Sequence, residues 1–362
     1  KIFGNQMVDM YKFACGCEVP ILNHTINPHT GLPSLDVDYD KLPLNCLDTW
    51  KIFHDGNTKG VFQVESKLAT AWSQNIKPDS VEDVSALISV IRPGVLETQL
   101  EGESMTKVFA NRKNKISPAT PLDPNIEDIL APTYQVIVYQ EQIMAIARLL
   151  AGFDLVQVDK LRKAVGKKNV EELNKCGVAF IEGCIKTGKV TKEKAEQIWD
   201  AIKASGRYSF NKSHGVSYAL IGYWTAWVKT HFPLQFYTSW LTMAKFKPKP
   251  KEEIKALVSD AKYNGIYIKA PNLSMKPLPK DFTIYEKNIY FGFRDVKKFG
   301  EAQVNKLITK VKEAEEKYGN IKDWTWFQFL LRLGGIGKTL VHNIISVGGL
   351  DFFNLPRRYM LF

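Results

Sequence analysis

The stretch Phe210-Asn-Lys-Ser-His-Gly-Val-Ser-Tyr-Ala219 opens the clearest helix of the sequence, which we expect to run from Val216 to Phe232. Apolar side chains recur at helical spacing along one face of it. A second face is polar and aromatic. It is either an ordinary wetted face or a surface on which a base stacks with phosphates at the ends. The members of that face lie three or four residues apart: His214, Tyr218, Gly222, Thr225 and Lys229.

A second cationic segment, Leu161-Arg-Lys-Ala-Val-Gly-Lys-Lys168, precedes the first one. Lys160, Lys163 and Lys167 share one helix face, Gly166 suits a left-handed C-cap, and the apolar members turn inward. Cations near a helix C-terminus complement its dipole by about 0.3 to 1 kcal/mol each, which accounts for one or two of them. The segment has five cations in nine residues, and these repel one another unless an anion offsets them. The two segments could hold one polyphosphate or nucleic-acid strand between them.

The overall charge agrees with an anionic partner. The 362 residues contain 49 Lys and Arg against 38 Asp and Glu, a formal net charge of +11. This balance favours nucleic acid or an anionic membrane surface. The sequence has no run near the roughly 20 apolar residues of a membrane span and no signal-peptide pattern. We therefore expect a cytoplasmic protein with no membrane partner.

Two sets of possible metal ligands lack support from the sequence. Cys15-x-Cys17 has no second cysteine pair or histidine pair at zinc-site spacing. The alternating Asp36, Asp38 and Asp40 would share one face of a strand, but no apolar strand adjoins them, so a solvated loop is favoured. The five cysteines are too few and too irregular for a disulfide framework. We therefore expect reduced thiols and no metal site.

Helical periodicity dominates residues 58–244. Apolar residues recur at intervals of three and four through 137–151, 170–185 and 192–204. Arg92-Pro-Gly94 predicts a tight turn between two helices, with proline at its second position and glycine at its third. Arg92 is either a solvated turn residue or a rigidly mounted functional guanidinium.

Residues 245–362 have a different composition. The charged, proline-containing stretch 245–251 is expected to run extended and to mark a domain boundary. A strand is expected at 289–293, and a helix from Glu301. In Leu333-Gly-Gly-Ile-Gly-Lys338, a Gly-hydrophobic-Gly step before a helix exposes backbone N–H groups to a phosphate, although a plain turn is equally economical. The candidate DNA-binding residues are Lys297, Lys298, Gly300, Gly335, Gly337 and Lys338.

Five short segments match, in order and in spacing, the motifs of one known family: Gly60–Ser66, Arg92–Gly94, Thr133–Gln142, Leu161–Lys168 and Phe210–Ala219. Together they resemble the C-family replicative DNA polymerases, which are the bacterial DNA polymerase III alpha subunits and their phage relatives. The resemblance extends from about Leu42 to Phe353. It implies a mainly α fold with a helical fingers domain at 58–244, a small α+β helix-hairpin-helix-like region at 245–362 and a connecting segment at 1–57.

The resemblance also implies a binding site. In this family the cationic helix and the Asn-Lys-Ser-His segment face the triphosphate of the incoming deoxynucleotide. Phosphoryl transfer is catalysed mainly by positioning and by neutralising phosphate charge, which suits fixed arginines and lysines. The nucleotide-binding residues implied are Arg92, Arg162, Lys163, Lys167, Lys168, Asn211, Lys212, His214 and Tyr218.

Three positions depart from the family pattern. Lys163 replaces a usual arginine and cannot clamp a phosphate bidentately. Gly215 replaces a usual alanine or serine, so we expect a looser backbone after His214. Lys298-Phe299-Gly300 replaces a usual Gly-x-Gly, which puts its phosphate grip in question.

The catalytic carboxylates of the family are expected outside this chain. In the family, palm aspartates hold two Mg²⁺ ions, and this sequence, which opens on Lys1 with no Met, resembles a part that starts just past them. No catalytic residue is therefore assigned. The implied partners are primer-template DNA and a deoxynucleoside triphosphate. A sliding clamp and other replisome subunits would bind through regions not present here.

Two other functions stay open. A non-enzymatic DNA-binding module would use the same basic faces and hairpins for architecture. A hydrolase would use Glu65 or Glu141 as general acid or base, but neither has a second carboxylate at a suitable spacing.

Overall fold

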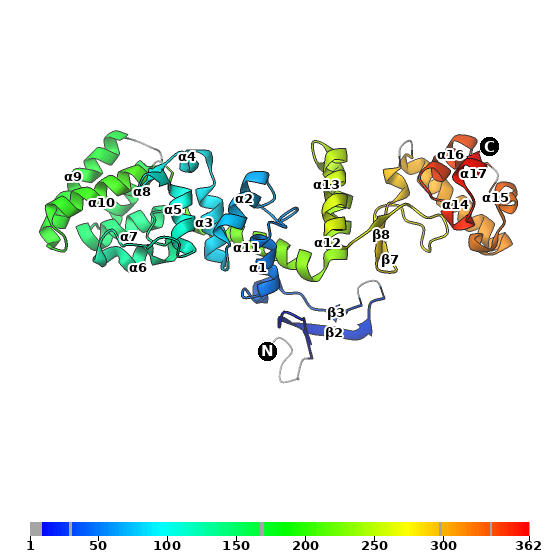
Figure 1. Cartoon of the computed structure of the whole chain (residues 1–362), viewed down its shortest axis with the longest axis horizontal. Helices are drawn as coiled ribbons and strands as arrows, with labels where there is room; N and C mark the ends of the chain where they lie inside the picture. The colour runs from blue at the N-terminus through cyan, green and yellow to red at the C-terminus, as the bar shows by residue number, and fades with distance from the viewer. Residues whose placement is uncertain are drawn as a thin grey trace. The chain divides into compact units, whose positions relative to one another are not determined.

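The computed structural model describes residues 9–28, 31–166, 170–206, 208–296, 299–333 and 335–361. These divide into two compact units. The helical unit contains residues 12–18 and 37–230, and the mixed unit contains residues 9–11, 19–36 and 231–361. Most of the labelled elements are helices (Figure 1), so the predicted mainly α fold is confirmed. The three-part division at residues 57 and 244 stays a prediction.

The first half of the helical unit consists of short capped helices. Three serines cap the helices that follow them: Ser66, Ser80 and Ser104. Each side chain accepts a hydrogen bond from a backbone N–H in the first helical turn, where the N–H groups have no partner within the helix. The elements are α1 (Leu47–His54), α2 (Lys67–Ile76), α3 (Val81–Val90), α4 (Pro93–Leu96), the short strands β4 (Gln99–Leu100) and β5 (Glu103–Ser104), α5 (Met105–Lys113) and α6 (Glu127–Leu130).

The predicted turn at Arg92 is wrong in its geometry. Arg92 is the N-cap of α4, Pro93 is the first helical residue, and Gly94 has no positive φ. A proline at the first helical position has no N–H to leave unpaired and already has a helical φ. The segment therefore starts a helix instead of forming a turn that needs glycine.

The second half of the unit packs four helices around one apolar core that includes Phe180 and Trp199. Helix α7 packs against α8 and α9, and α9 also packs against α8 and α10. Leu161 and Val165 are buried as predicted, whereas Gly166 lies within the last turn of α8 without a positive φ, so the left-handed cap is wrong. The helices are α7 (Gln140–Ala151), α8 (Leu155–Gly166), α9 (Val170–Thr187) and α10 (Lys192–Gly206).

Helix α11 (Lys212–His231) begins four residues before its predicted start. Tyr223 and Trp227 are fully buried, as the apolar stripe indicated. The prediction of one continuous polar face is wrong for its C-terminal half. Thr225 Oγ1 accepts the N–H of Phe62 at 3.0 Å, and Lys229 is 3 % exposed, because the loop through residues 57–62 covers them.

The mixed unit combines two small sheets with helices. The sheets have the orders β1-β2-β3 and β6-β8-β7, and β8 pairs parallel to β6 and antiparallel to β7. The strands are β1 (Met10–Lys12), β2 (Glu18–Ile26), β3 (Pro33–Leu35), β6 (Ile268–Lys269), β7 (Thr283–Tyr285) and β8 (Asn288–Tyr290). The helices are α12 (Pro233–Met243), α13 (Pro250–Tyr263), α14 (Glu301–Tyr318), α15 (Trp326–Arg332), α16 (Lys338–Ser346) and α17 (Arg357–Leu361).

Two predictions for the mixed unit are corrected. The segment 245–251 does not run extended throughout, because a 3₁₀ turn at Ala244–Phe246 and the start of α13 at Pro250 take up most of it. The predicted strand at 289–293 is shorter and ends at Tyr290, since a 3₁₀ turn follows at Phe293–Asp295. The predicted helix starts at Glu301 and Lys338 are confirmed. Further 3₁₀ turns lie at Tyr39–Lys41, Pro124–Ile126, Ala131–Thr133, Ile321–Asp323 and Asp351–Phe353.

Within the ranges described above, no helix has the length and apolar character needed to cross a membrane.

Candidate functional site

Two helices of the helical unit start side by side. Tyr139 and Phe210 form an isolated parallel bridge, in which the N–H of Phe210 donates to the Val138 carbonyl and the N–H of Gln140 donates to the Phe210 carbonyl, both at 2.9 Å. Helix α7 begins at the residue after Tyr139, and α11 begins two residues after Phe210. Their N-termini, each the positive end of a helix dipole, therefore lie together.

Glu141 and Asn211 satisfy the first turn of α11. The Glu141 carboxylate accepts the backbone N–H of Lys212 at 2.9 Å and the Asn211 side-chain amide at 3.0 Å. The Asn211 side-chain oxygen Oδ1 accepts the backbone N–H of His214 at 2.9 Å and the Ser213 hydroxyl at 2.7 Å. Because these donors are used internally, an anion at this place would be held by side chains more than by the helix backbone.

The Lys212 ammonium lies over an aromatic ring. Its Nζ is 5.9 Å from the ring centroid of Tyr139, within the range of a cation–π interaction. The Tyr139 hydroxyl donates to Ser85 Oγ at 2.9 Å, and burial raises the pKa of Tyr139 to about 12, so the ring is neutral at physiological pH. Lys212 is half-buried and is the first residue of α11.

A row of four rings runs along the N-terminal half of α11. Ring centroids are 5.4 Å apart for Phe210 and His214, 4.2 Å for His214 and Tyr218, and 5.3 Å for Tyr218 and Phe62. His214 is exposed and Tyr218 is half-buried, so part of the row is open to a stacking base. The predicted polar and aromatic face of this helix is therefore accessible only at its N-terminal end.

Gly215 lies beneath the row of rings and is buried in α11. A Cβ built there would be 2.6 Å from Ser85 Oγ on α3, closer than real side chains approach. The expected looser backbone is not what the packing indicates, because glycine here lets α11 approach α3 closely. Its role is steric.

Arg92 is held by protein groups. Its Nε donates to the Ser89 carbonyl at 3.0 Å, its Nη2 donates to the Tyr208 carbonyl at 2.5 Å, and its guanidinium lies 4.4 Å from the Phe210 ring centroid. Burial lowers the pKa of Arg92 from its ordinary value. These contacts favour a positioning role, in which Arg92 fixes the segment that leads into α11.

The cations of α8 are differently placed. Arg162 donates to Asp159 at 2.8 Å and Lys163 lies 2.7 Å from the same carboxylate, and all three side chains are exposed. Hydrogen bonds from Lys163 and Arg162 lower the pKa of Asp159. A Cβ built on Gly166 would lie 3.8 Å from Gln140 Nε2, so the C-terminal end of α8 meets the start of α7. Lys167 and Lys168 lie outside the described residues.

The second candidate interface is in the mixed unit. Gly335 and Gly337 are exposed with φ of +86° and +93°, while Ile336 between them is buried. Lys338 is exposed at the first position of α16. Gly300 is the exposed N-cap of α14. The structure therefore forms a hairpin between α15 and α16 as expected, whereas Lys297 and Lys298 lie outside the described residues.

The carboxylates considered for catalysis have other partners. Asp38 accepts the N–H of Asp40 at 3.2 Å and pairs with Lys41 at 2.7 Å, and the hydrogen bond from Lys41 lowers its pKa. Glu65 lies 3.4 Å from Lys59. Over the described part of the chain, the only His, Cys, Asp or Glu group close enough to share an ion is rich in thiols, which does not suit Mg²⁺.

Sequence reasoning missed the capping role of Glu141. The residue stands in a motif, but no local pattern reveals that its carboxylate reaches the start of a helix 71 residues further on. Phe62 and Ser85 were missed for the same reason, since their contacts with Tyr218 and Gly215 exist only in the folded chain.

Comparison with known proteins agrees with this architecture. Residues 21–188 match the model of the bacterial DNA polymerase III alpha subunit finger domain, and residues 268–360 match a helix-hairpin-helix motif. The DNA polymerase III alpha subunit of Aquifex aeolicus is 34 % identical over 345 residues, which are 95 % of this chain and 28 % of that protein.

Other relatives show the same pattern. The alpha subunit of Thermus aquaticus is 34 % identical over 324 residues, covering 88 % of this chain and 25 % of that protein. That of Pseudomonas aeruginosa is 33 % identical over 327 residues, covering 89 % and 26 %. The chain thus spans about a quarter of the length of these relatives. It belongs to the C-family DNA polymerase III alpha subunits, of which it corresponds to the finger domain and the helix-hairpin-helix region.

Proposed function

We infer that this chain is the nucleotide-binding and DNA-holding part of a DNA-directed DNA polymerase, a nucleotidyltransferase that acts in DNA replication. The observation that supports this most is the meeting of α7, α8 and α11 in the helical unit. The N-termini of α7 and α11 lie side by side there, and the C-terminal end of the cationic α8 lies next to the start of α7.

In this proposal the triphosphate of a deoxynucleotide binds where Lys212 and the α8 cations can reach it. Arg162 and Lys163 are exposed, and among the described residues both pair with Asp159, so a triphosphate offers them more negative charge than this one carboxylate does. Phosphate oxygens accept charge-assisted hydrogen bonds from such donors. The nucleobase would stack on the open part of the ring row at His214 and Tyr218.

The partner of the mixed unit is primer-template DNA, held by the hairpin at Gly335 and Gly337 through its phosphates. Positive φ at both glycines turns the backbone sharply before α16, so the first N–H groups of that helix are presented to solvent beside Lys338. This contact needs no base-specific reading, in keeping with a protein that acts on any sequence.

Nucleotidyl transfer itself would depend on palm carboxylates outside this chain, which would hold Mg²⁺ ions. The carboxylates described here do not form such a set, and no step is assigned to them. A sliding clamp and other replisome subunits would contact regions beyond this chain. Because the DNA partner is cytoplasmic in bacteria, we place the protein there.

The test of the nucleotide site is binding of a labelled deoxynucleoside triphosphate in the presence of primer-template, at fixed salt. Arg162→Ala/Lys212→Ala is compared with Lys107→Ala/Lys192→Ala. The control removes two exposed lysines, each paired with a glutamate one turn away, and changes the net charge equally. We expect saturable binding that falls at least tenfold, about 1.4 kcal/mol, only in the first variant. Equal loss in both variants would point to net charge and contradict the site.

The test of the DNA interface is the salt dependence of duplex binding. Each phosphate neutralised contributes about −0.9 to the slope of log affinity against log salt. Lys338→Ala should make the slope less steep by about that amount, whereas Lys312→Ala, which removes a lysine paired with Glu316 on α14, should not. Unchanged duplex binding without any nucleotide binding would favour the alternative, a non-enzymatic DNA-binding module.

A further inference from the structure

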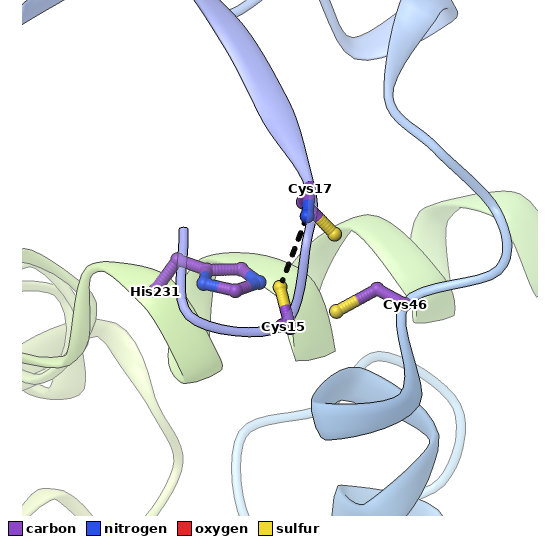
Figure 2. Close-up of side chains that lie close together, drawn as sticks. All are labelled: Cys15, Cys17, Cys46 and His231. Carbon is purple, nitrogen blue, oxygen red and sulfur yellow. Dashed lines mark hydrogen bonds between the residues drawn. The ribbon is translucent and has the colours of Figure 1, made fainter. Parts of the chain in front are cut away.

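Three thiols and one imidazole gather at the C-terminal end of α11 (Figure 2). Their ligand atoms, the Sγ of Cys15, Cys17 and Cys46 and a ring nitrogen of His231, all lie within 4.8 Å of one another. His231 is the last residue of α11, and the helix carries it one residue past the division between the two units, which falls after Thr230. The four residues come from three separate parts of the sequence.

The turn between β1 and β2 places the first two thiols together. The N–H of Phe13 donates to the Cys17 carbonyl and the N–H of Gly16 donates to the Phe13 carbonyl, both at 2.8 Å, while Gly16 has a φ of +88°. The backbone N–H of Cys17 points at the Cys15 sulfur at 3.4 Å (Figure 2). Both thiols are therefore fixed within one short, hydrogen-bonded turn.

Cys46 and the helix that ends at His231 are held by packed residues of the helical unit. Cys46 is the N-cap of α1 and is 1 % exposed, and its N–H donates to the Tyr223 hydroxyl at 3.4 Å. Tyr223 is fully buried in α11, the helix that ends at His231. Trp227 lies one turn before the C-terminal end of α11 and packs edge-on against Phe13, with ring centroids 5.7 Å apart. The ligands are therefore fixed by packed elements and do not depend on a single exposed loop.

The donor set and spacing select the ion. Zn–S bonds of about 2.3 Å put the ligand atoms of a tetrahedral site about 3.8 Å apart, so side-chain movements of about 1 Å would close this group around Zn²⁺. Three soft sulfur ligands and an imidazole exclude Mg²⁺ and Ca²⁺ as preferred ions. Four protein ligands leave no open position for a substrate, which makes the site structural.

We propose that Cys15, Cys17, Cys46 and His231 form a structural zinc site. Zinc would join the turn at residues 13–17, the start of α1 and the end of α11. Binding releases the protons of the three thiols and breaks no other bond. Burial together with the neighbouring Cys15 and Cys46 thiols raises the pKa of Cys17 in the metal-free group, the direction expected when close-packed sulfurs lack a cation. No zinc-site spacing is visible in the sequence, because Cys46 and His231 lie far along the chain from the Cys15-x-Cys17 pair.

The first test is metal content. The whole chain is purified with a thiol reductant and excess zinc, desalted and analysed by mass spectrometry for metals. We expect about one zinc per chain, retained in Cys184→Ser and lost in Cys17→Ser and Cys46→Ser. Cys184 is a matched control because it is also a fully buried thiol, on α9 and outside the group. A zinc content of the wild type near zero would overturn the proposal, as would equal zinc in all variants.

The second test does not depend on the folding of a variant. Co²⁺ replaces zinc in the wild-type chain, and thiolate ligation is detected by its ultraviolet sulfur-to-cobalt charge-transfer absorption together with intense visible bands of a tetrahedral ion. Both are expected, and excess zinc should abolish them. Weak visible bands of octahedral cobalt without charge transfer would overturn the proposal. A disulfide between two of the three cysteines in the reduced preparation, detected by peptide mass, would also overturn it.

Discussion

The two ends of helix α11 contain similar residues in very different surroundings. At the N-terminal end, beside the start of α7, His214 is exposed and Lys212 is half-buried. At the C-terminal end, Lys229 is 3 % exposed and donates to the Asn57 carbonyl, the Asn57 side chain and the Lys59 carbonyl, each at 2.9 Å. One lysine thus holds the fold together, while the other remains available to a ligand.

The difference comes from what packs on each half of the helix. The loop through residues 57–62 covers the C-terminal half and supplies carbonyl acceptors for Lys229. The N-terminal half instead meets α3 through Gly215 and leaves the rings of His214 and Tyr218 partly open. A cation on a polar helix face therefore reveals its role only once its neighbours are known. Four substitutions test this contrast.

The largest effect is expected from Lys229→Ala. The change leaves the carbonyl groups of the half-buried residues 57 and 59 without their charged donor, at a cost of about 3 kcal/mol in the free energy of unfolding. Urea unfolding followed by circular dichroism measures it. Lys212→Ala is the control at the other end of the helix and should change the free energy by less than about 0.5 kcal/mol. Similar losses in both variants would remove the contrast between the two ends.

The next effect concerns the packing of α11 on α3. Gly215→Ala introduces a Cβ 2.6 Å from Ser85 Oγ and should cost about 1 to 2 kcal/mol. Adding Ser85→Ala removes the clashing oxygen, so the double variant should be more stable than the sum of the single changes indicates. Thermal unfolding of all four proteins gives the coupling energy. Simple additivity would show that the two residues do not touch.

A smaller effect is expected at the cap. Asn211→Ala removes the acceptor of the His214 N–H and should cost about 1 kcal/mol of stability. Because the cap orients Lys212 and His214, we also expect weaker nucleotide binding, measured by titration with a labelled deoxynucleoside triphosphate. Zinc content, which depends on the opposite end of the helix, should stay the same. A loss of zinc in this variant would mean that the two ends are not independent.

The smallest effect is expected on α8. Asp159→Asn removes the carboxylate shared by Arg162 and Lys163. Exposed ion pairs of this kind are worth about 0.5 kcal/mol, so nucleotide affinity should rise about twofold as both cations become available to phosphate. Glu196→Gln on α10, whose carboxylate pairs with exposed Lys192, is the matched control and should leave affinity unchanged. Weaker binding in Asp159→Asn would contradict a phosphate role for these cations.

The sequence predicted the helices well because their apolar periodicity is long and regular. Helices α7, α9, α10 and α16 begin within three residues of their expected starts. It predicted the candidate site less well, because Glu141, Ser85 and Phe62 act on α11 across large sequence separations. The thiol group was missed for the same reason, since Cys46 and His231 join Cys15 and Cys17 only in the folded chain.

In the proposed site, the N-terminal end of α11 and the end of α8 share one triphosphate. The most direct measurement uses a nucleoside triphosphate analogue with a reactive acyl group on its γ-phosphate, which transfers that group to nearby lysines, followed by peptide mass spectrometry. We expect modification of Lys212 and Lys163 that excess deoxynucleoside triphosphate prevents, and weak modification of Lys192 that it does not prevent. Uniform modification of exposed lysines, or protection that spares Lys212 and Lys163, would contradict it.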